Sequence, residues 1–150
     1  MIHDVIITPL KIIEDDRGRI MHMLRCDASV YEQFGEIYFS TVFPGAVKAW
    51  KRHRRMRINL TVPVGRIRLV LYDGREGSSS KGKFQVILIG PDNYVLVTVP
   101  PLIWFGVAGM WHHESFLANL ATLPHDPAEL ERCPAHTSEI PYIWDLGFGD

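Results

Sequence analysis

The stretch GAVKAWKRHRRMRINLTVPVG, residues 45–65, carries the strongest signal for the fold. Two segments within it, Val47–His53 and Ile58–Val62, have the length and the β-branched and aromatic residues of strands, and an arginine-rich turn separates them. Because residues two apart on a strand point to the same face, Lys51 and His53 share one face of the first strand. We therefore expect a sheet that presents titratable side chains on one of its faces.

Short apolar segments bounded by glycine, proline and aspartate recur on both sides of this stretch, and their spacing is typical of an all-β sandwich or barrel. We expect short helices at Asp27–Phe34 and Pro127–Arg132, a mobile loop at Gly74–Gly82 and an irregular tail. The expected strands are Val5–Ile13, Ile20–Leu24, Ile37–Phe43, Val47–His53, Ile58–Val62, Arg66–Asp73, Phe84–Ile89, Tyr94–Val99, Ile103–Val107 and Ser115–Ala121.

The chain has 150 residues, of which 47% are hydrophobic and 22% charged, and its formal net charge is −1. This size and balance predict one domain over residues 1–150 and exclude a disordered chain. No apolar run approaches the roughly 18 residues that a membrane helix needs, and the first residues lack the pattern of a signal peptide. Cys26 and Cys133 are too few for a disulfide framework. We therefore expect a reduced, cytoplasmic protein without membrane contact.

Charge is distributed unevenly along the chain. Residues 114–150 contain seven acids and a single cation, Arg132. Residues 37–72 contain no Asp or Glu but eight cations, which are Lys48, Lys51, Arg52, Arg54, Arg55, Arg57, Arg66 and Arg68. One interpretation is that the two regions neutralise each other or cover solvated surfaces. The other is an anion site, because a local field of one sign attracts phosphates even at a net charge near zero.

The opening stretch also matches the spacing of the cupin signature, which reads Gly, five residues, His-x-His, three or four residues, Glu, six residues, Gly. Gly45 and Gly65 hold its ends, and the second cupin motif, Pro-x-Gly-x-x-His, falls on residues 100–105. The usual metal-ligand positions are therefore Lys51, His53, Ile58 and Phe105. One imidazole cannot hold a divalent ion that takes three or four N, O or S ligands. We expect a double-stranded β-helix, the jelly-roll barrel of cupins, with no metal and with any small ligand bound inside.

Further short motifs follow in a fixed order. They are Asp15-Asp16-Arg17-Gly18, Pro44–Trp50, Val62–Arg68, Leu71–Arg75, Val99-Pro100-Pro101 and Ile140-Pro141-Tyr142. Over roughly residues 5–146 this ordered set resembles the dTDP-4-dehydrorhamnose 3,5-epimerase family, the RmlC-type cupins. The resemblance implies a homodimeric jelly-roll barrel and neither cofactor nor metal. It implies as substrate a nucleotide diphospho-4-keto-6-deoxy sugar, with a dTDP-linked deoxyhexose as the first expectation.

The residues that carry the family's chemistry differ in this sequence. In the family a barrel His removes a proton next to the 4-keto group, an Asp orients that His, and a Tyr serves the opposite face of the ring. Here Lys51 occupies the base position and Ile143 the position of the orienting Asp. The Tyr expected within residues 117–127 is absent, and His125 is the nearest titratable residue. We therefore expect a poor 3,5-epimerase with non-standard site residues.

Lys51 and His53 are the candidate catalytic residues. Like charges should lower the pKa of Lys51, so that it acts as a base or forms a Schiff base with a keto sugar. The alternative is that Lys51 only pairs with a diphosphate or a carboxylate. For His53 the alternative to acid–base chemistry is a neutral, hydrogen-bonded barrel residue.

The candidate substrate-binding residues are Arg17, Lys48, Arg52 and Asp73. Lys48 and Arg52 are expected to bind a diphosphate together with Lys51, although Arg52 points to the opposite strand face. The resemblance implies that Arg17 reaches the phosphates bound by the neighbouring subunit; otherwise it is a turn residue with a surface ion pair. Asp73 ends a strand. The alternative to substrate binding is a structural role, in which its carboxylate pairs with Arg75 or Lys51.

Three functions are consistent with these observations. The first is an epimerase or isomerase that acts on a nucleotide-linked deoxysugar in polysaccharide biosynthesis. The second is a binding or scaffolding cupin that keeps the sugar-nucleotide pocket without its chemistry. The third, a nucleic-acid binder that uses the arginine-rich strands, is disfavoured because the strands lack an RNP-like aromatic pattern.

Overall fold

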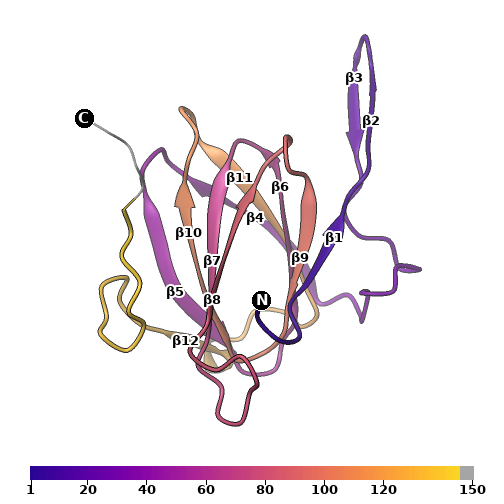
Figure 1. Ribbon diagram of the computed structural model, residues 1–150. Helices are drawn as coiled ribbons and strands as arrows, with labels where there is room; N and C mark the ends of the chain where they lie inside the picture. Colours follow the sequence, from indigo (N-terminus) through magenta and orange to yellow (C-terminus); the bar gives the residue numbers. More distant parts are fainter. Residues whose placement is uncertain (146–150) are drawn as a thin grey trace.

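The computed structural model describes residues 1–145, and the last five residues of the predicted domain lie outside this range. Two antiparallel five-stranded sheets pack face to face, and a two-stranded hairpin projects from them (Figure 1). The strands are β1 (Ile6–Pro9), β2 (Ile12–Asp15), β3 (Gly18–Met21), β4 (Glu36–Val42), β5 (Val47–His53), β6 (Ile58–Val64), β7 (Ile67–Asp73), β8 (Phe84–Ile89), β9 (Val95–Val99), β10 (Ile103–Gly109), β11 (Ser115–Ala121) and β12 (Leu130–Arg132); η1 (Pro127–Glu129) is a turn of 3-10 helix. The all-β jelly-roll prediction is confirmed.

We name each large sheet after the strand that contributes to the site described below. The β4 sheet has the order β1-β9-β6-β11-β4, and the β5 sheet has the order β12-β5-β10-β7-β8. Their facing sides enclose the main core, in which Leu60 and Val97 of one sheet meet Leu69 and Leu71 of the other. Alternation along each strand decides which side chains enter this core, so Tyr38 points inward with Val42 on β4 while Phe39 points outward.

Most predicted strands overlap the observed ones, and three of them coincide with β5, β8 and β11. The predicted strand Val5–Ile13 is instead two strands, β1 and β2, and Ile20–Leu24 overlaps only the end of β3. The predicted helix at Asp27–Phe34 is wrong. Turns occupy this segment, with Tyr31 N–H donating to the carbonyl of Ala28, and Val30 is buried. Val30 and Leu96 of β9 line the same hollow, so burial against the outer face of the β4 sheet overrides the weak local helix preference. At the second predicted helix, Pro127–Arg132, only η1 is helical and β12 follows it.

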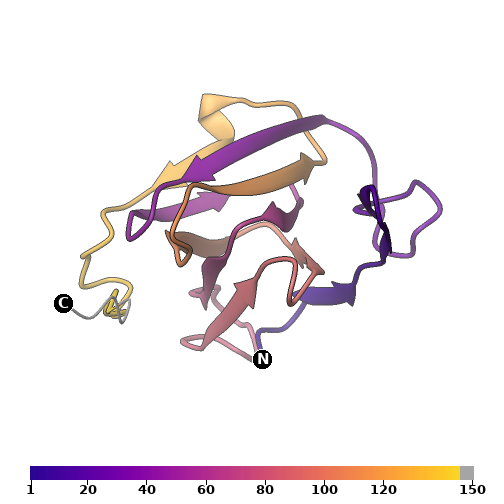
Figure 2. The same ribbon diagram turned by 90° about the horizontal axis from the view of Figure 1, so that it is seen from above.

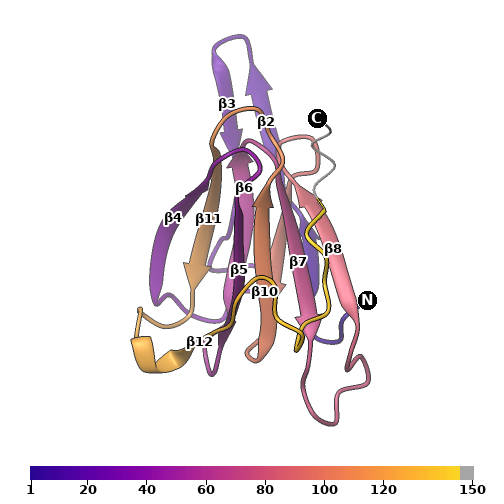
Figure 3. The same cartoon turned by 90° about the vertical axis from the view of Figure 1, so that its left-hand side faces the viewer.

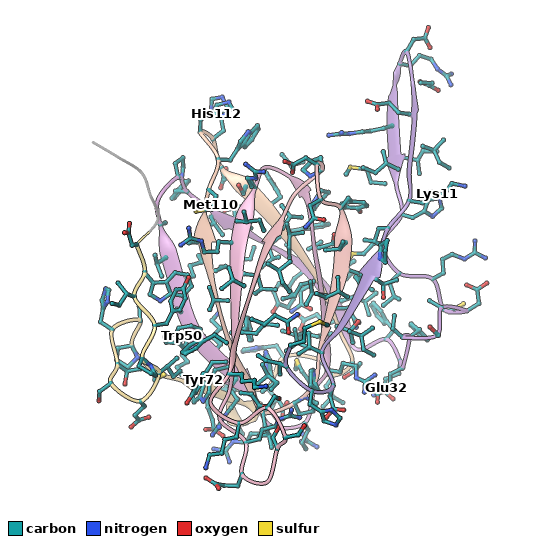
Figure 4. The ribbon with its side chains drawn as sticks, viewed as in Figure 1. Lys11, Glu32, Trp50, Tyr72, Met110 and His112 are labelled. Atoms are coloured by element: carbon teal, nitrogen blue, oxygen red, sulfur yellow. The ribbon has the colours of Figure 1, made fainter. Side chains whose placement is uncertain are left out.

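A second apolar cluster covers the outer face of the β5 sheet. Trp50 and Val70 of this sheet pack with Ile140, Tyr142 and Trp144 of the C-terminal segment. Figure 3 shows this segment running across the sheet, and Figure 4 shows Trp50 and Tyr72 on the same side of the molecule as the segment. One face of strand β5 therefore packs against this outer cluster, and the other face points toward the space between the two sheets. In residues 1–145 no helix is long and apolar enough to cross a membrane.

The two sheets approach each other along one open edge, where β4 ends one sheet and β12 with β5 ends the other. The Lys48 ammonium on β5 spans this edge, donating to the Thr41 carbonyl at 2.7 Å and to the Ser40 hydroxyl at 3.1 Å on β4. Strand β12 pairs with β5 in a register that places Arg132 beside Lys51 and Leu130 beside His53. The fold thus gathers residues of β4, β5 and β12 at one mouth of the barrel.

Candidate active site at the open edge of the barrel

A cavity of about 250 Å³ opens between β4 and the β5–β12 pair. Its lining residues are Glu36, Tyr38, Lys51, His53, His125, Leu130 and Arg132. The alternation along β5 brings Lys51 and His53 to the cavity side, as the sequence predicts, and leaves Trp50 and Arg52 on the outer side. The structure therefore brings the two candidate catalytic residues together.

The surroundings of Lys51 favour its neutral form. Burial is the main reason that its pKa is lowered from the ordinary value of 10.5, and the charges of Arg132 and then Lys48 lower it further. No carboxylate of residues 1–145 lies within salt-bridge distance of its ammonium. An amine with a depressed pKa and no counter-ion has the properties of a general base or a Schiff-base nucleophile.

His53 stays neutral near pH 7. Burial lowers its pKa from 6.5, Glu129 opposes this effect, and Lys51 and His125 lower the pKa further. Its ring stacks on Phe105 with 5.9 Å between centroids, and its buried Nδ1 has no hydrogen-bond partner within the described chain. No carboxylate of the described residues therefore fixes the tautomer of this imidazole.

A second cavity of about 310 Å³ adjoins the first. It is lined by Val47, Lys48, Ala49, Trp50, Lys51, Arg132 and Cys133, so that Lys51 and Arg132 border both cavities. None of its lining residues is an acid, and in the described part of the chain neither Lys48 nor Arg132 forms an ion pair. This concentration of positive charge suits a phosphate group.

Arg52 does not join these cations. On the outer face of β5 its guanidinium donates to Glu131 at 2.6 Å and lies 4.6 Å from the centroid of the Trp104 ring. The sequence prediction grouped Arg52 with Lys48 and Lys51 by proximity along the chain. Arg132 takes the place that this prediction gave to Arg52, because its register on β12 sets it beside Lys51.

Asp73 lies away from both cavities in a network of its own. Its side chain is 0% exposed, and its two oxygens accept hydrogen bonds from Arg75, Ser78 and Ser80 at 2.6 to 3.0 Å. Although burial raises its pKa, these hydrogen bonds outweigh burial and hold the pKa well below the usual range. In this conformation the carboxylate cannot touch a ligand. It instead ties the loop at residues 74–82, predicted to be mobile, to the end of β7.

Arg17 and Ile143 are also remote from Lys51 within one chain. Arg17 is at the tip of the β2–β3 hairpin, where it pairs with Asp15 at 2.7 Å. Seen from above, the hairpin and the C-terminal segment lie on opposite sides of the barrel (Figure 2). Ile143 in that segment is 85% exposed and lines neither cavity, so the position of the family's orienting Asp does not reach the Lys51 side chain here.

The cupin metal positions hold side chains that are poor ligands. Ile58 is in the main core, and Phe105 stacks on His53. Among residues 1–145 no group of three or more His, Cys, Asp and Glu side chains is arranged to hold a metal ion. A metal-free barrel remains our prediction from the donor chemistry of these positions.

Sequence reasoning missed Tyr38, Glu36 and Arg132 as site residues. Glu36 and Tyr38 come from β4, which is far from β5 in sequence, and only the closure of the two sheets brings them to the same cavity. Arg132 had a usable signal, since it is the one cation in the acidic C-terminal part of the sequence. His125, noted as the nearest titratable residue to an absent Tyr, does line the cavity, and its backbone N–H donates to Glu36.

Two curated proteins are similar to this chain over nearly its whole length. The chain is 36% identical over 149 residues to the probable low-salt glycan biosynthesis epimerase Agl13 of Haloferax volcanii, with 96% of this chain and 95% of that protein covered. It is 29% identical over 150 residues to the spore coat polysaccharide biosynthesis protein SpsL of Bacillus subtilis, with 99% of each covered. No family model matches the chain.

Solved structures show the same fold. A dTDP sugar isomerase from Desulfovibrio desulfuricans G20 superposes with a TM-score of 0.93 at 43% identity and covers 95% of this chain and 92% of its own. The 3,5-epimerase RmlC from Legionella pneumophila shares the fold with a TM-score of 0.83 at 18% identity, over 96% of this chain and 80% of its own.

The jelly-roll barrel with a polar cavity at its open edge defines an RmlC-type cupin. The chain belongs to the dTDP-4-dehydrorhamnose 3,5-epimerase family and is related to sugar epimerases across nearly its whole length.

Proposed function

We propose that the protein is an epimerase or isomerase of a nucleotide diphospho-4-keto-6-deoxy sugar in deoxysugar or polysaccharide biosynthesis. The observation that carries this proposal is Lys51, a half-buried amine with a lowered pKa and no carboxylate counter-ion, beside His53 in a cavity at the mouth of the barrel. A 4-keto group acidifies the neighbouring C–H, and a neutral amine in contact with that carbon removes the proton. Lys51 is the base in this proposal, and His53 donates a hydrogen bond to the substrate.

The adjoining cavity supports the placement of the diphosphate. Lys48, Lys51 and Arg132 border it without an acid, whereas the sugar is placed in the first cavity, where the Nδ1 atom of His53 lacks a partner among the described residues. A dTDP-linked deoxyhexose has two matching parts, an anionic diphosphate and a neutral polar sugar. The solved relative at 43% identity is a dTDP sugar isomerase, which supports the same choice of nucleotide sugar.

A second copy of the chain completes the site in this proposal. The outer face of the β4 sheet exposes Phe39 and Phe116, and the hairpin pairs Ile13 with Ile20, both exposed. An isolated two-stranded hairpin is marginally stable, and an apolar patch of this kind marks an interface. A two-fold homodimer covers these surfaces and carries the partner's hairpin tip, with Arg17, toward the phosphates.

The binding or scaffolding cupin is the second candidate. The observation that favours it is the environment of His53, whose Nδ1 has no carboxylate partner among the described residues and whose ring packs on Phe105. A catalytic imidazole normally has an orienting acceptor. In this alternative the cavities bind the nucleotide sugar and release it unchanged.

Deuterium uptake separates the two candidates. dTDP-4-keto-6-deoxyglucose is incubated with the protein in D2O, and exchange at C3 and C5 is followed by NMR while dTDP binding is measured by calorimetry. The enzyme proposal expects exchange that Lys51→Ala lowers at least 100-fold and that the matched surface control Lys83→Ala leaves unchanged. Binding of dTDP without exchange establishes the scaffolding candidate, and exchange that survives Lys51→Ala rejects Lys51 as the base.

A further inference from the structure

The Tyr38 hydroxyl lies in the wall of the first cavity that β4 provides. Its side chain is 39% exposed and faces inward on the edge strand, while Lys51 reaches the same cavity from β5 in the opposite sheet. A sugar ring held between the two sheets would therefore have an amine on one side and a phenol on the other.

Asn119 fixes the position of this phenol. It is directly opposite Tyr38 in the register of β11 and β4, and its Nδ2 donates to the Tyr38 oxygen at 2.8 Å. Asn119 is only 3% exposed, so its amide has little freedom to move. The Asn119 amide thus occupies one lone pair of the Tyr38 oxygen. The phenolic O–H has no acceptor in residues 1–145, so it is available to donate to a ligand.

The amide of Asn119 has a second feature that points to a ligand. Its Oδ1 is buried and has no hydrogen-bond partner within the described residues. A buried amide oxygen without a donor is costly, and such groups are retained where a substrate or ordered water satisfies them. The same is true of His53 Nδ1 across the cavity. Of these two residues, His53 lines the cavity, whereas Asn119 contacts it only through Tyr38.

We propose that Tyr38 is a second acid–base residue, which works on the face of the sugar opposite Lys51, and that Asn119 is its positioning residue. This inference rests on the proposed function. The neutral Lys51 amine takes the proton from the carbon next to the keto group, and the C–H electrons form the enolate. The Tyr38 O–H then gives its proton to the other face of that carbon, the enolate returns to the ketone, and the configuration is inverted. Solvent reprotonates the phenolate and takes the extra proton from the lysine ammonium.

The Tyr38→Phe variant tests the catalytic part of this proposal. Two measurements separate proton removal from inversion. Deuterium incorporation into the recovered substrate measures proton removal by Lys51, and formation of the inverted product measures proton donation by Tyr38. We expect Tyr38→Phe to keep deuterium incorporation within about threefold of the wild type and to lower inversion about 100-fold or more. The matched control is Tyr31→Phe, which removes the hydroxyl of a tyrosine that lines neither cavity and leaves inversion within about threefold.

Asn119→Leu tests the positioning part. We expect kcat for inversion to fall about tenfold with little change in KM, and the double variant with Tyr38→Phe to be no slower than Tyr38→Phe alone. An effect of Asn119 on the fold would instead add to that of Tyr38→Phe. Unchanged inversion in Tyr38→Phe, or an equal loss in Tyr31→Phe, overturns the inference and leaves the proposed function intact. Absence of exchange in the wild type overturns the proposed function and this inference with it.

Discussion

Lys51 illustrates how neighbouring groups change the basicity of a side chain. Burial, Arg132 and Lys48 all act in the same direction on the pKa of its amine. A lysine at this position is therefore neutral over a wider pH range than a solvent-exposed lysine. At the residue scale, the register between β12 and β5 is what supplies the second of these effects.

Arg132→Gln should shift the pH dependence of the reaction. Because Arg132 lowers the pKa of Lys51, its removal raises that pKa, and less of the amine is neutral at a given pH. The acidic limb of the kcat/KM profile should move to higher pH, with activity lost near pH 7 and regained in alkaline buffer. Arg132→Lys keeps the charge and serves as the control. An unshifted acidic limb in Arg132→Gln would show that Lys51 is not the titrating base.

Glu129 provides a second residue-scale prediction, one that concerns stability. Its buried carboxylate accepts hydrogen bonds from the backbone N–H groups of Met56 at 2.6 Å and Arg55 at 2.7 Å. Burial raises its pKa, but these hydrogen bonds outweigh burial, so the folded-state pKa is below 4.5. The stabilisation is therefore present above about pH 4.5 and is lost as the pH falls through the folded-state pKa.

Glu129→Gln should lower the free energy of unfolding by about 2 kcal/mol or more at pH 7, because a charged hydrogen-bond acceptor is replaced by a neutral one. The difference from the wild type should shrink as the pH is lowered below 4.5 and the native carboxylate becomes protonated. Urea unfolding across this pH range measures the effect. A difference that is constant with pH would assign the loss to packing.

At the scale of elements, β5 is shaped by a register shift against β10. Phe105 pairs with Lys51 while Val107 pairs with Lys48, so β5 carries an additional residue between them. Gly106 faces this irregularity and leaves room for Ala49 and Trp144. The absence of a side chain there allows the strand that holds Lys51 to sit between the cavity and the C-terminal segment.

Gly106→Ala should disturb this arrangement. A Cβ at residue 106 would lie 2.6 Å from the Ala49 Cβ and 2.9 Å from Trp144 Cζ2, so β5 or the C-terminal segment must shift. We expect a loss of about 1–3 kcal/mol in unfolding free energy and a fall in activity. At Gly74 the nearest atom to a new Cβ is 3.4 Å away, so Gly74→Ala is the matched control. Equal thermal stability of the two variants would contradict this account.

Strands were the predictable elements, because alternation and turn residues are local signals. The segment Val47–His53 could be assigned without knowledge of its partners, and its two faces followed from the period of a strand. The conformation of Asp27–Phe34 could not be assigned in this way, because it depends on the burial of Val30 against β9. In the site, Lys51 and His53 were accessible to the same reasoning, whereas Tyr38 and Arg132 depend on which strands become neighbours.

At the scale of the whole molecule, the proposed second copy of the chain would explain both the projecting hairpin and the exposed face of the β4 sheet. Phe39 is 65% exposed on β4, and the hairpin extends away from its own barrel (Figure 1). The hairpin and the C-terminal segment lie on opposite sides of the barrel (Figure 2), and no residue of the hairpin lines the cavity that contains Lys51. The site would then be a property of the pair of chains.

Complementation between variants tests this shared site. Arg17→Ala and Lys51→Ala should each lose activity as homodimers, with Arg17→Ala lowering dTDP affinity about tenfold or more. Co-expression of the two variants should restore about a quarter of wild-type activity, because half of the dimers are mixed and each mixed dimer has one intact site. Phe39→Glu should shift the protein toward monomer in analytical ultracentrifugation. No recovery in mixtures that are shown to contain heterodimer would place Arg17 outside the site.

The Trp50–Trp144 contact gives the protein an intrinsic optical reporter. The two indoles are 5.2 Å apart between centroids and inclined at 46°, a geometry in which their excited states couple and produce a circular dichroism couplet in the ultraviolet. One chromophore belongs to the strand that bears Lys51 and the other to the segment that covers it. A ligand entering from the opposite face of that strand would alter the couplet if it displaces the strand, so occupancy can be followed without a label.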